Sequence, residues 1–264
     1  MPTARRDGRG LYYEADGEGE VVAFVADAGY GAWSWGWQHR VVAGPFDALV
    51  WDLPGTGRSD PSEGASSVAA LAADLEAVLA DHGARRVHLV GHGLGGMVAL
   101  RSARDSGRVV SLTLIGTSPG GPLAPLPPDA RTRAYAPPDD PEGLRRATAA
   151  ALTDAFVADQ PAVVDGIVDW RADEDAGPAA WRAQDAAVEA FDASDWLHEV
   201  TEPALVVHGR DDAQYPVENG RLLAEGLPRG DLLELDGGHL VTVERSRPLN
   251  DELVAFLERH RRDE

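Results

Sequence analysis

The sequence contains no cysteine, no lysine and no long apolar run. Without cysteine, disulfides and thiolate chemistry are excluded. No stretch of ~18 apolar residues is present, so the sequence predicts no membrane-spanning helix. The first ten residues carry charges and lack an apolar core, so we expect no signal peptide and a cytoplasmic location.

Acidic side chains are in large excess over basic ones. The chain has 44 Asp and Glu residues against 24 basic residues, all of them arginine, and its formal net charge is -20 at pH 7. A field of this sign repels nucleic acid and anionic membranes, so we expect neither as a partner. Such a composition resembles that of proteins from salt-accumulating halophiles. The alternative is an acidic protein from a GC-rich genome, in which arginine codons replace lysine codons.

The hydrophobic pattern predicts a covered sheet. With 44% hydrophobic residues, the 264-residue chain can bury a substantial core despite its charge. Short apolar runs predict strands over residues 11–15, 21–26, 46–52, 86–92, 109–115, 204–208 and 231–235. Apolar residues at helical spacing, or helical composition, predict helices over residues 68–82, 97–105, 217–227 and 249–261. Uninterrupted apolar strands are typical of sheets with helices on both faces.

A long insertion separates two of the predicted strands. Repeated proline and glycine over 119–128 end the pattern, and the chain stays rich in Ala, Asp and Glu to about residue 195. Helices are expected there over residues 142–158, 162–172 and 179–191. Bulky apolar residues are few, so we expect Phe156, Trp170, Trp181 and Phe191 to supply the contact with the rest of the protein.

The central motif is the glycine-rich turn after the strand at 86–92. Gly91-His92-Gly93-Leu94-Gly95 leads directly into a helix. This strand, turn and helix resemble the nucleophile elbow of the α/β-hydrolase superfamily, whose pattern is G-x-S-x-G. Gly93 stands where the family carries its Ser, Cys or Asp nucleophile. Glycine accepts the strained backbone of that position at little steric cost, but it offers no side chain that could attack a carbonyl.

Three further motifs extend the resemblance over essentially the whole chain. Residues 52–59 match the family's D-x-x-G-x-G-x-S turn, Gly209 to Asp212 match G-x-x-D, and Gly237-Gly238-His239 match G-G-H. The resemblance implies an α/β fold in which a mostly parallel central sheet is flanked by helices. It assigns residues 1–118 and 196–264 to the core domain and 119–195 to a helical cap, which is matched in position only. It also makes Asp212, rather than Asp211, the acid and His239 the histidine of a catalytic triad.

The family's oxyanion hole would be formed here by the backbone N–H groups of Gly29 and Leu94. The usual His-Gly pair before the first donor is replaced by Asp27-Ala28. Two placements of Asp27 are open: its carboxylate stands beside the donors, or it turns away and binds its own loop. In the first case two like charges ~4 Å apart repel by about 4 kcal/mol at an effective dielectric of ~20.

Other candidate groups are weaker. Ser34 and Ser118 lie away from the elbow, and Ser59 is expected to cap its turn. His92 is expected to point into the structure beside the sheet. The eight histidines show no spacing with carboxylates that suggests a metal site, and we expect no cofactor.

Three functions are compatible with these residues. The first is a nucleophile-free enzyme, lyase-like or oxygenase-like, in which His239 and Asp212 act as general base or acid on a small apolar substrate beneath the cap, with Gly93 at the floor of the pocket. The second is a non-catalytic pseudo-hydrolase that binds a small molecule. The third is an ester or amide hydrolase represented as a Ser-to-Gly variant, in which Gly93→Ser would restore a reactive hydroxyl. The substrate, pathway and oligomeric state stay open.

We predict that folding requires high salt, because the net charge of -20 opposes compaction until it is screened. Thermal unfolding from low salt to molar KCl should show a midpoint that rises with salt. A midpoint that is flat over this range would contradict the halophile interpretation.

Overall fold

The computed structural model describes residues 2–62, 64 and 66–262. One eight-stranded sheet crosses the molecule in the order β1-β2-β4-β3-β5-β6-β7-β8. The strands are β1 (Thr3–Arg6), β2 (Arg9–Asp16), β3 (Val21–Val25), β4 (Asp47–Trp51), β5 (Val87–His92), β6 (Val109–Ile115), β7 (Ala204–Gly209) and β8 (Gly230–Leu235).

The sheet is mostly parallel, as predicted. All neighbouring pairs from β4 to β8 are parallel, whereas β1 and β2 add an antiparallel extension at one edge. β1 was absent from the sequence prediction because its residues are mostly polar. Only Ala4 is buried in it, so the strand carries too few apolar residues for a hydrophobic signal.

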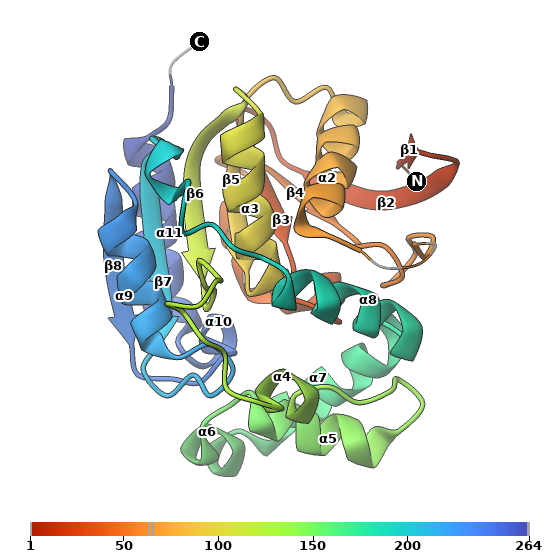
Figure 1. The fold of residues 1–264 in the computed structure, drawn as a ribbon. Helices are drawn as coiled ribbons and strands as arrows, with labels where there is room; N and C mark the ends of the chain where they lie inside the picture. The colour runs from red at the N-terminus through yellow and green to blue at the C-terminus, as the bar shows by residue number, and fades with distance from the viewer. Residues whose placement is uncertain (1, 63, 65, 263–264) are drawn as a thin grey trace.

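Helices cover both faces of the sheet (Figure 1). The helices α2 (Val68–His82), α3 (Leu94–Asp105) and α9 (Val217–Gly226) contribute to one apolar cluster, and α10 (Val241–Glu244) and α11 (Ser246–Arg259) to the other, together with α1 (Gly36–Val42). Alternate residues of β3 supply the two clusters: Val25 belongs to the first and Phe24 to the second. This alternation is the period of a strand buried on both sides.

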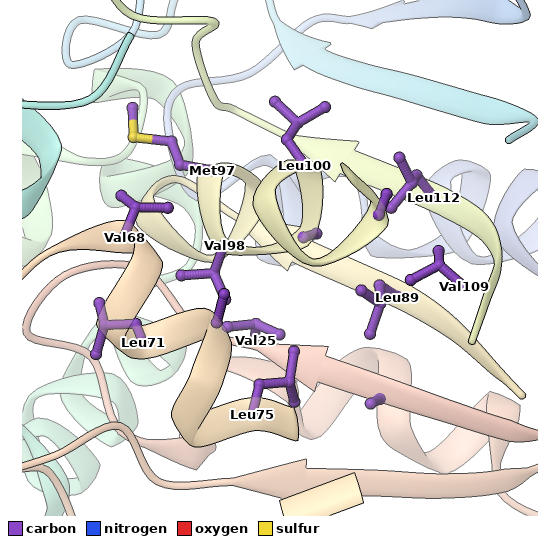
Figure 2. Packing of buried hydrophobic residues seen from close by; sticks show 14 of the residues in the cluster. Val25, Val68, Leu71, Leu75, Leu89, Met97, Val98, Leu100, Val109 and Leu112 are labelled. Atoms are coloured by element: carbon purple, nitrogen blue, oxygen red, sulfur yellow. The ribbon is translucent and has the colours of Figure 1, made fainter. Parts of the chain in front are cut away.

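The face beneath the elbow helix is densely packed (Figure 2). Leu71 and Leu75 of α2 meet Val98 of α3, and Val25 and Leu89 of the sheet lie beneath them. All five side chains are fully buried. At roughly 1.5–3 kcal/mol per buried aliphatic side chain, this packing holds the elbow in a fixed position on the sheet.

The insertion between β6 and β7 is helical and lies beyond the carboxyl ends of the parallel strands (Figure 1). It contains α4 (Ala130–Arg133), α5 (Pro141–Ala150), α6 (Asp154–Asp159), α7 (Pro161–Glu174) and α8 (Pro178–Glu189). The 3-10 helix η1 (Ala32–Trp35) precedes α1, and η2 (Leu197–Glu199) follows α8 shortly before β7. The division of the chain into core and cap at residues 118 and 196 stays a prediction.

One predicted helix of the insertion is wrong in its length. Residues 142–158 form two helices, α5 and α6, because the chain turns at 151–153. The Thr153 hydroxyl donates to a carboxylate oxygen of Glu244 at 2.6 Å and accepts from the Phe156 N–H. Thr153 therefore starts a new helix as its N-cap. The other two predicted helices correspond to α7 and α8.

A buried ion pair fastens the insertion to the loop after β3. Arg171 Nε lies 2.7 Å from Asp175 Oδ2, and both side chains are almost completely buried. The other oxygen of Asp175 accepts from the indole N–H of Trp33 at 2.7 Å and from the Gly31 N–H at 3.2 Å. Each charge therefore has several partners, which a buried pair requires, and loop residues 31–33 are bound to the end of α7.

The aromatic residues expected at the contact between the insertion and the rest of the protein are found there, with Trp181 lying against Gly29. Trp170 meets Trp37 edge to face at 5.8 Å, and Phe191 belongs to the cluster beneath the elbow helix. Phe156 packs against the opposite cluster. Within the described residues, no helix is long and apolar enough to cross a membrane.

Candidate functional site

The turn between β5 and α3 has the geometry of an elbow. Gly93 adopts φ 51° and ψ -116°, a conformation that strains any residue with a Cβ. A Cβ on Gly91 would overlap the Gly95 carbonyl, and one on Gly95 would overlap the Val25 carbonyl. The glycines at 91 and 95 thus allow the helix to start directly against the sheet.

The Asp27 carboxylate occupies the space above Gly93. A Cβ on Gly93 would overlap this carboxylate. Asp27 Oδ1 accepts a hydrogen bond from the Leu94 N–H at 2.6 Å. Of the two placements left open by the sequence, the structure has the one beside the oxyanion donors. A serine at position 93 would overlap the Asp27 carboxylate as the structure places it, so the predicted gain of a reactive hydroxyl in Gly93→Ser now requires Asp27 to move.

His239 is bound on both sides by carboxylates. Its Nδ1 lies 2.9 Å from Asp212 Oδ2, which confirms the predicted hydrogen bond, and its Nε2 lies 3.0 Å from Asp27 Oδ2. The exposed fractions of Asp27, Asp212 and His239 are 3%, 6% and 1%. With both carboxylates ionised, which lets them only accept hydrogen bonds, both ring nitrogens donate and the ring is an imidazolium.

The ionisation of the three groups is mutually reinforced. Burial alone would lower the pKa of His239, but the charges and hydrogen bonds of Asp212 and Asp27 raise it to about 10. Burial alone would raise the pKa of Asp27 and of Asp212, yet both pKa values lie below their ordinary range, mainly because of His239. Backbone N–H groups of Gln214 and Tyr215 also bind Asp212, at 2.8 and 2.9 Å.

Two aromatic rings hold the imidazolium in place. His92 stacks on His239 with centroids 4.3 Å apart, and the Tyr215 ring stacks on it at 5.3 Å. His92 points into the structure as predicted, where its Nε2 donates to the His239 carbonyl at 3.0 Å. Burial and the neighbouring His239 charge lower the pKa of His92 to about 4, so its ring is neutral beside the cation.

Both predicted oxyanion donors are occupied by side chains. Asp27 takes the Leu94 N–H, and the Gln184 amide oxygen accepts from the Gly29 N–H at 2.7 Å. The other end of the Gln184 amide donates to the Pro54 carbonyl at 3.1 Å. Because Gln184 lies on α8, the insertion itself fills the second donor position.

The candidate serine hydroxyls lie away from Gly93 and form other hydrogen bonds. Ser59 caps its turn as predicted, since its Oγ donates to the Asp52 carbonyl at 2.7 Å. Ser34 Oγ donates to the Gly31 carbonyl, and Ser118 Oγ accepts from the Gly120 N–H. Ser111 bonds His88 Nδ1 at 2.7 Å, but it is 1% exposed and pairs with the start of β5, at the opposite end from Gly93.

Among the residues that the structure describes, no three His, Asp or Glu side chains are grouped to hold a metal ion. In the centre itself the imidazolium stands between the two carboxylates. Its positive charge takes the place that a metal cation would have between them.

The elbow and the Asp212–His239 pair lie within the part of the chain that matches a family model. The model of the alpha/beta hydrolase family matches residues 22–252. The chain belongs to this family. Among relatives, it is 33% identical to the candidate carbamate hydrolase RutD of Variovorax paradoxus, over 94% of this chain and 96% of that protein.

Two further similarities concern hydrolases. The chain is 31% identical to the 2-hydroxy-6-oxononadienedioate/2-hydroxy-6-oxononatrienedioate hydrolase of Cupriavidus pinatubonensis, over 90% of this chain and 86% of that protein. The enol-lactonase of Burkholderia xenovorans superposes with a TM-score of 0.85 at 23% identity, over 97% of this chain and 100% of that one. At this identity the superposition supports the fold alone.

The direct Asp27–His239 contact was not predicted from the sequence, although the strand register indicates it. β3 and β5 are parallel neighbours in which Val25 pairs with Gly91. Two residues further along each strand stand Asp27 and Gly93, so the register sets them level with each other. Gln184 and Tyr215 were missed because neither lies in a family motif that names them.

We predict that the His239 ring is protonated at pH 8 and titrates near pH 10, and that Asp27→Asn lowers its pKa by removing one carboxylate. Since this pKa is raised from 6.5 to about 10 on folding, the stability it contributes is fully present below pH ~6.5 and is lost as the pH rises to ~10. Ring NMR signals and thermal unfolding over this range test both statements. His239→Gln should lack this pH dependence, and an unchanged pKa in Asp27→Asn would contradict the geometry.

Proposed function

We propose that this chain is an enzyme that moves a proton on a small carbonyl-containing molecule without forming a covalent intermediate. The observation that carries the proposal is the Asp27 carboxylate, which stands in the space of the missing nucleophile, between the Leu94 N–H and His239. A carboxylate paired with a protonated imidazole is a base and an acid side by side. General acid–base catalysis uses such a pair of groups.

The roles follow from the ionisation state. In the resting centre His239 carries the proton and Asp27 does not, so Asp27 is the base and His239 the acid. Asp27 takes a proton from the carbon next to the carbonyl, and His239 gives its Nε2 proton to the carbonyl oxygen. An enol and a neutral Asp27–His239 pair result, and the reverse transfers restore the start. Asp212 keeps its charge throughout and orients the ring.

Of the two roles expected for His239, general base or general acid, this assignment keeps the acid. A general base needs an unprotonated nitrogen, and a pKa of about 10 for His239 leaves few such rings at neutral pH. The base role passes to Asp27, whose lowered pKa keeps it unprotonated at neutral pH while making it a weaker base than an ordinary carboxylate. Once Asp27 is protonated, one of the two negative charges that hold the His239 proton is gone, so that proton transfers more easily.

The relatives support a small carbonyl compound as the substrate class. The protein of Variovorax paradoxus is named for a carbamate and that of Cupriavidus pinatubonensis for an oxo acid. We infer a small molecule of related carbonyl chemistry for this chain. Acyl transfer is disfavoured here, because an acyl intermediate needs a nucleophile and free oxyanion donors.

A second candidate function, non-catalytic binding of a small molecule, is favoured by one observation. The Leu94 and Gly29 donors are both satisfied by side chains of the protein, Asp27 and Gln184. A centre closed in this way needs no substrate to complete its hydrogen bonds. The two functions differ in whether Asp27 and His239 exchange protons with the bound molecule.

We predict that the protein exchanges protons next to a carbonyl with solvent. Small uncharged ketones in D2O, followed by proton NMR, should lose their α-proton signals faster with the protein than with buffer. Asp27→Asn and His239→Gln should each slow the exchange by about 10²–10⁴-fold, the usual weight of one general acid or base. The exposed neighbour Asp211→Asn is the matched control and should exchange at the wild-type rate. Wild-type protein that exchanges no ketone of the panel would favour binding without catalysis.

We further predict how serine chemistry can be recovered. Neither wild type nor Gly93→Ser should react with phosphonate probes. The wild type has no hydroxyl at position 93, and in Gly93→Ser the Asp27 carboxylate fills the space of the serine side chain. The double variant Asp27→Gly, Gly93→Ser should be labelled, since it frees the Leu94 N–H and presents a serine to His239. Asp27→Gly alone is the control. Labelling of Gly93→Ser alone would support the third hypothesis, a hydrolase that differs by one residue.

A further inference from the structure

A cavity of about 610 Å³ lies between helix α1 and the C-terminal half of helix α7. Its walls carry three tryptophans, Trp33, Trp37 and Trp170, and the carboxylate of Glu174. Among the residues that line it, none belongs to the catalytic centre proposed above. A ligand can therefore bind in this cavity without reaching that centre.

The two outer indoles of the cavity form an open corner. The rings of Trp37 and Trp170 are inclined at 75°, with their centroids 5.8 Å apart, and Trp170 is 43% exposed. A group placed in the angle between the rings touches both of their faces. Indole is the side chain whose face attracts a cation most strongly, and cages of such faces are typical of sites for quaternary ammonium groups.

Elsewhere the protein supplies such cations from its own side chains. A guanidinium lies 4.5–5.9 Å from the ring centroid of five aromatic residues, which are Tyr12, Tyr30, Phe46, Trp196 and Phe256. Within the described residues, none lies over Trp37 or Trp170, although Arg40 lines the same cavity. The two indole faces of this corner are thus left open to an external cation.

A carboxylate is fixed beside the indoles. Glu174 Oε2 accepts a hydrogen bond from the Trp33 backbone N–H at 2.8 Å, and the Trp33 indole N–H donates in turn to Asp175 at 2.7 Å. Burial raises the pKa of Glu174, and the carboxylates of Asp52 and Asp175 add to this rise. A cation bound in the cavity would oppose the rise, because it favours the ionised carboxylate.

We propose that this cavity binds an organic cation, with a quaternary ammonium group between the faces of Trp37 and Trp170 and its charge toward Glu174. The net charge of -20 draws cations to the protein. The indole faces then select those that are large and have no N–H to donate, for which aromatic rings are good partners. Arg40 carries like charge in the wall and opposes the ligand.

Choline and 3,3-dimethyl-1-butanol test the role of the charge, because the alcohol has the same shape with carbon in place of the ammonium nitrogen. We expect choline to bind at least roughly tenfold more tightly than the alcohol in buffered NaCl. The indole N–H signals of Trp37 and Trp170 in NMR spectra measure both affinities. Equal affinities, or no saturable shift with choline, would overturn the proposal.

Trp170→Leu is the decisive variant, because it removes one aromatic face and leaves the net charge of the protein unchanged. It should abolish the preference for choline over the alcohol, now measured from the Trp37 signal. Trp170→Phe keeps a ring and should retain part of the preference. A preference that survives in Trp170→Leu would mean that the negative field of the whole protein holds choline, which would contradict the site.

Two charge variants should act in opposite directions. Glu174→Gln should weaken choline binding roughly fivefold, and Arg40→Gln should tighten it by a similar factor, since one removes an attracting charge and the other a repelling one. The matched controls are Glu225→Gln in α9 and Arg5→Gln in β1, which are exposed and lie outside the cavity walls. Equal effects of variant and control would count against the assignment. Binding is measured without turnover, so its loss leaves the proposed proton transfer untouched.

Discussion

The candidate site depends on one buried cation held between two buried carboxylates. His239 is the hydrogen-bond donor to both Asp27 and Asp212, and each carboxylate is stabilised in turn by backbone N–H groups. Removing one partner of a buried ion pair typically costs about 3–5 kcal/mol, since the remaining charge is left without compensation. The three residues therefore form one unit, and the loops that carry them are held together by it.

The sheet makes this unit possible. β3, β5 and β7 end at the same edge because they are parallel, and the register of β3 on β5 puts Asp27 level with Gly93. A Cβ at position 93 would overlap the Asp27 carboxylate where the structure places it. The two departures from the family pattern are thus one structural change, in which a charged group from the loop replaces a side chain from the elbow.

Much of the fold could be predicted from the sequence because its signals are local. The apolar runs of β3 and β6 and the helical spacing of α2 each lie within one segment, and the motif at Gly237 to His239 fixes the histidine. β1 carries no such signal, and the break between α5 and α6 depends on Glu244, ninety-one residues from Thr153. The contacts of Asp27 and Gln184 likewise depend on strand register and helix docking, which no single segment contains.

The exchange of a neutral nucleophile for a carboxylate changes what the elbow can stabilise. In the family the backbone N–H groups of the oxyanion hole stabilise a negative charge that forms on the substrate. Here the Leu94 N–H already binds the negative charge of Asp27 in the resting centre, and the positive charge of His239 balances it. A further anion at this place finds no donor and no counter-charge. Chemistry that adds negative charge at this place is therefore disfavoured, whereas a reaction in which Asp27 takes up one proton and His239 gives up another leaves the net charge of the centre unchanged.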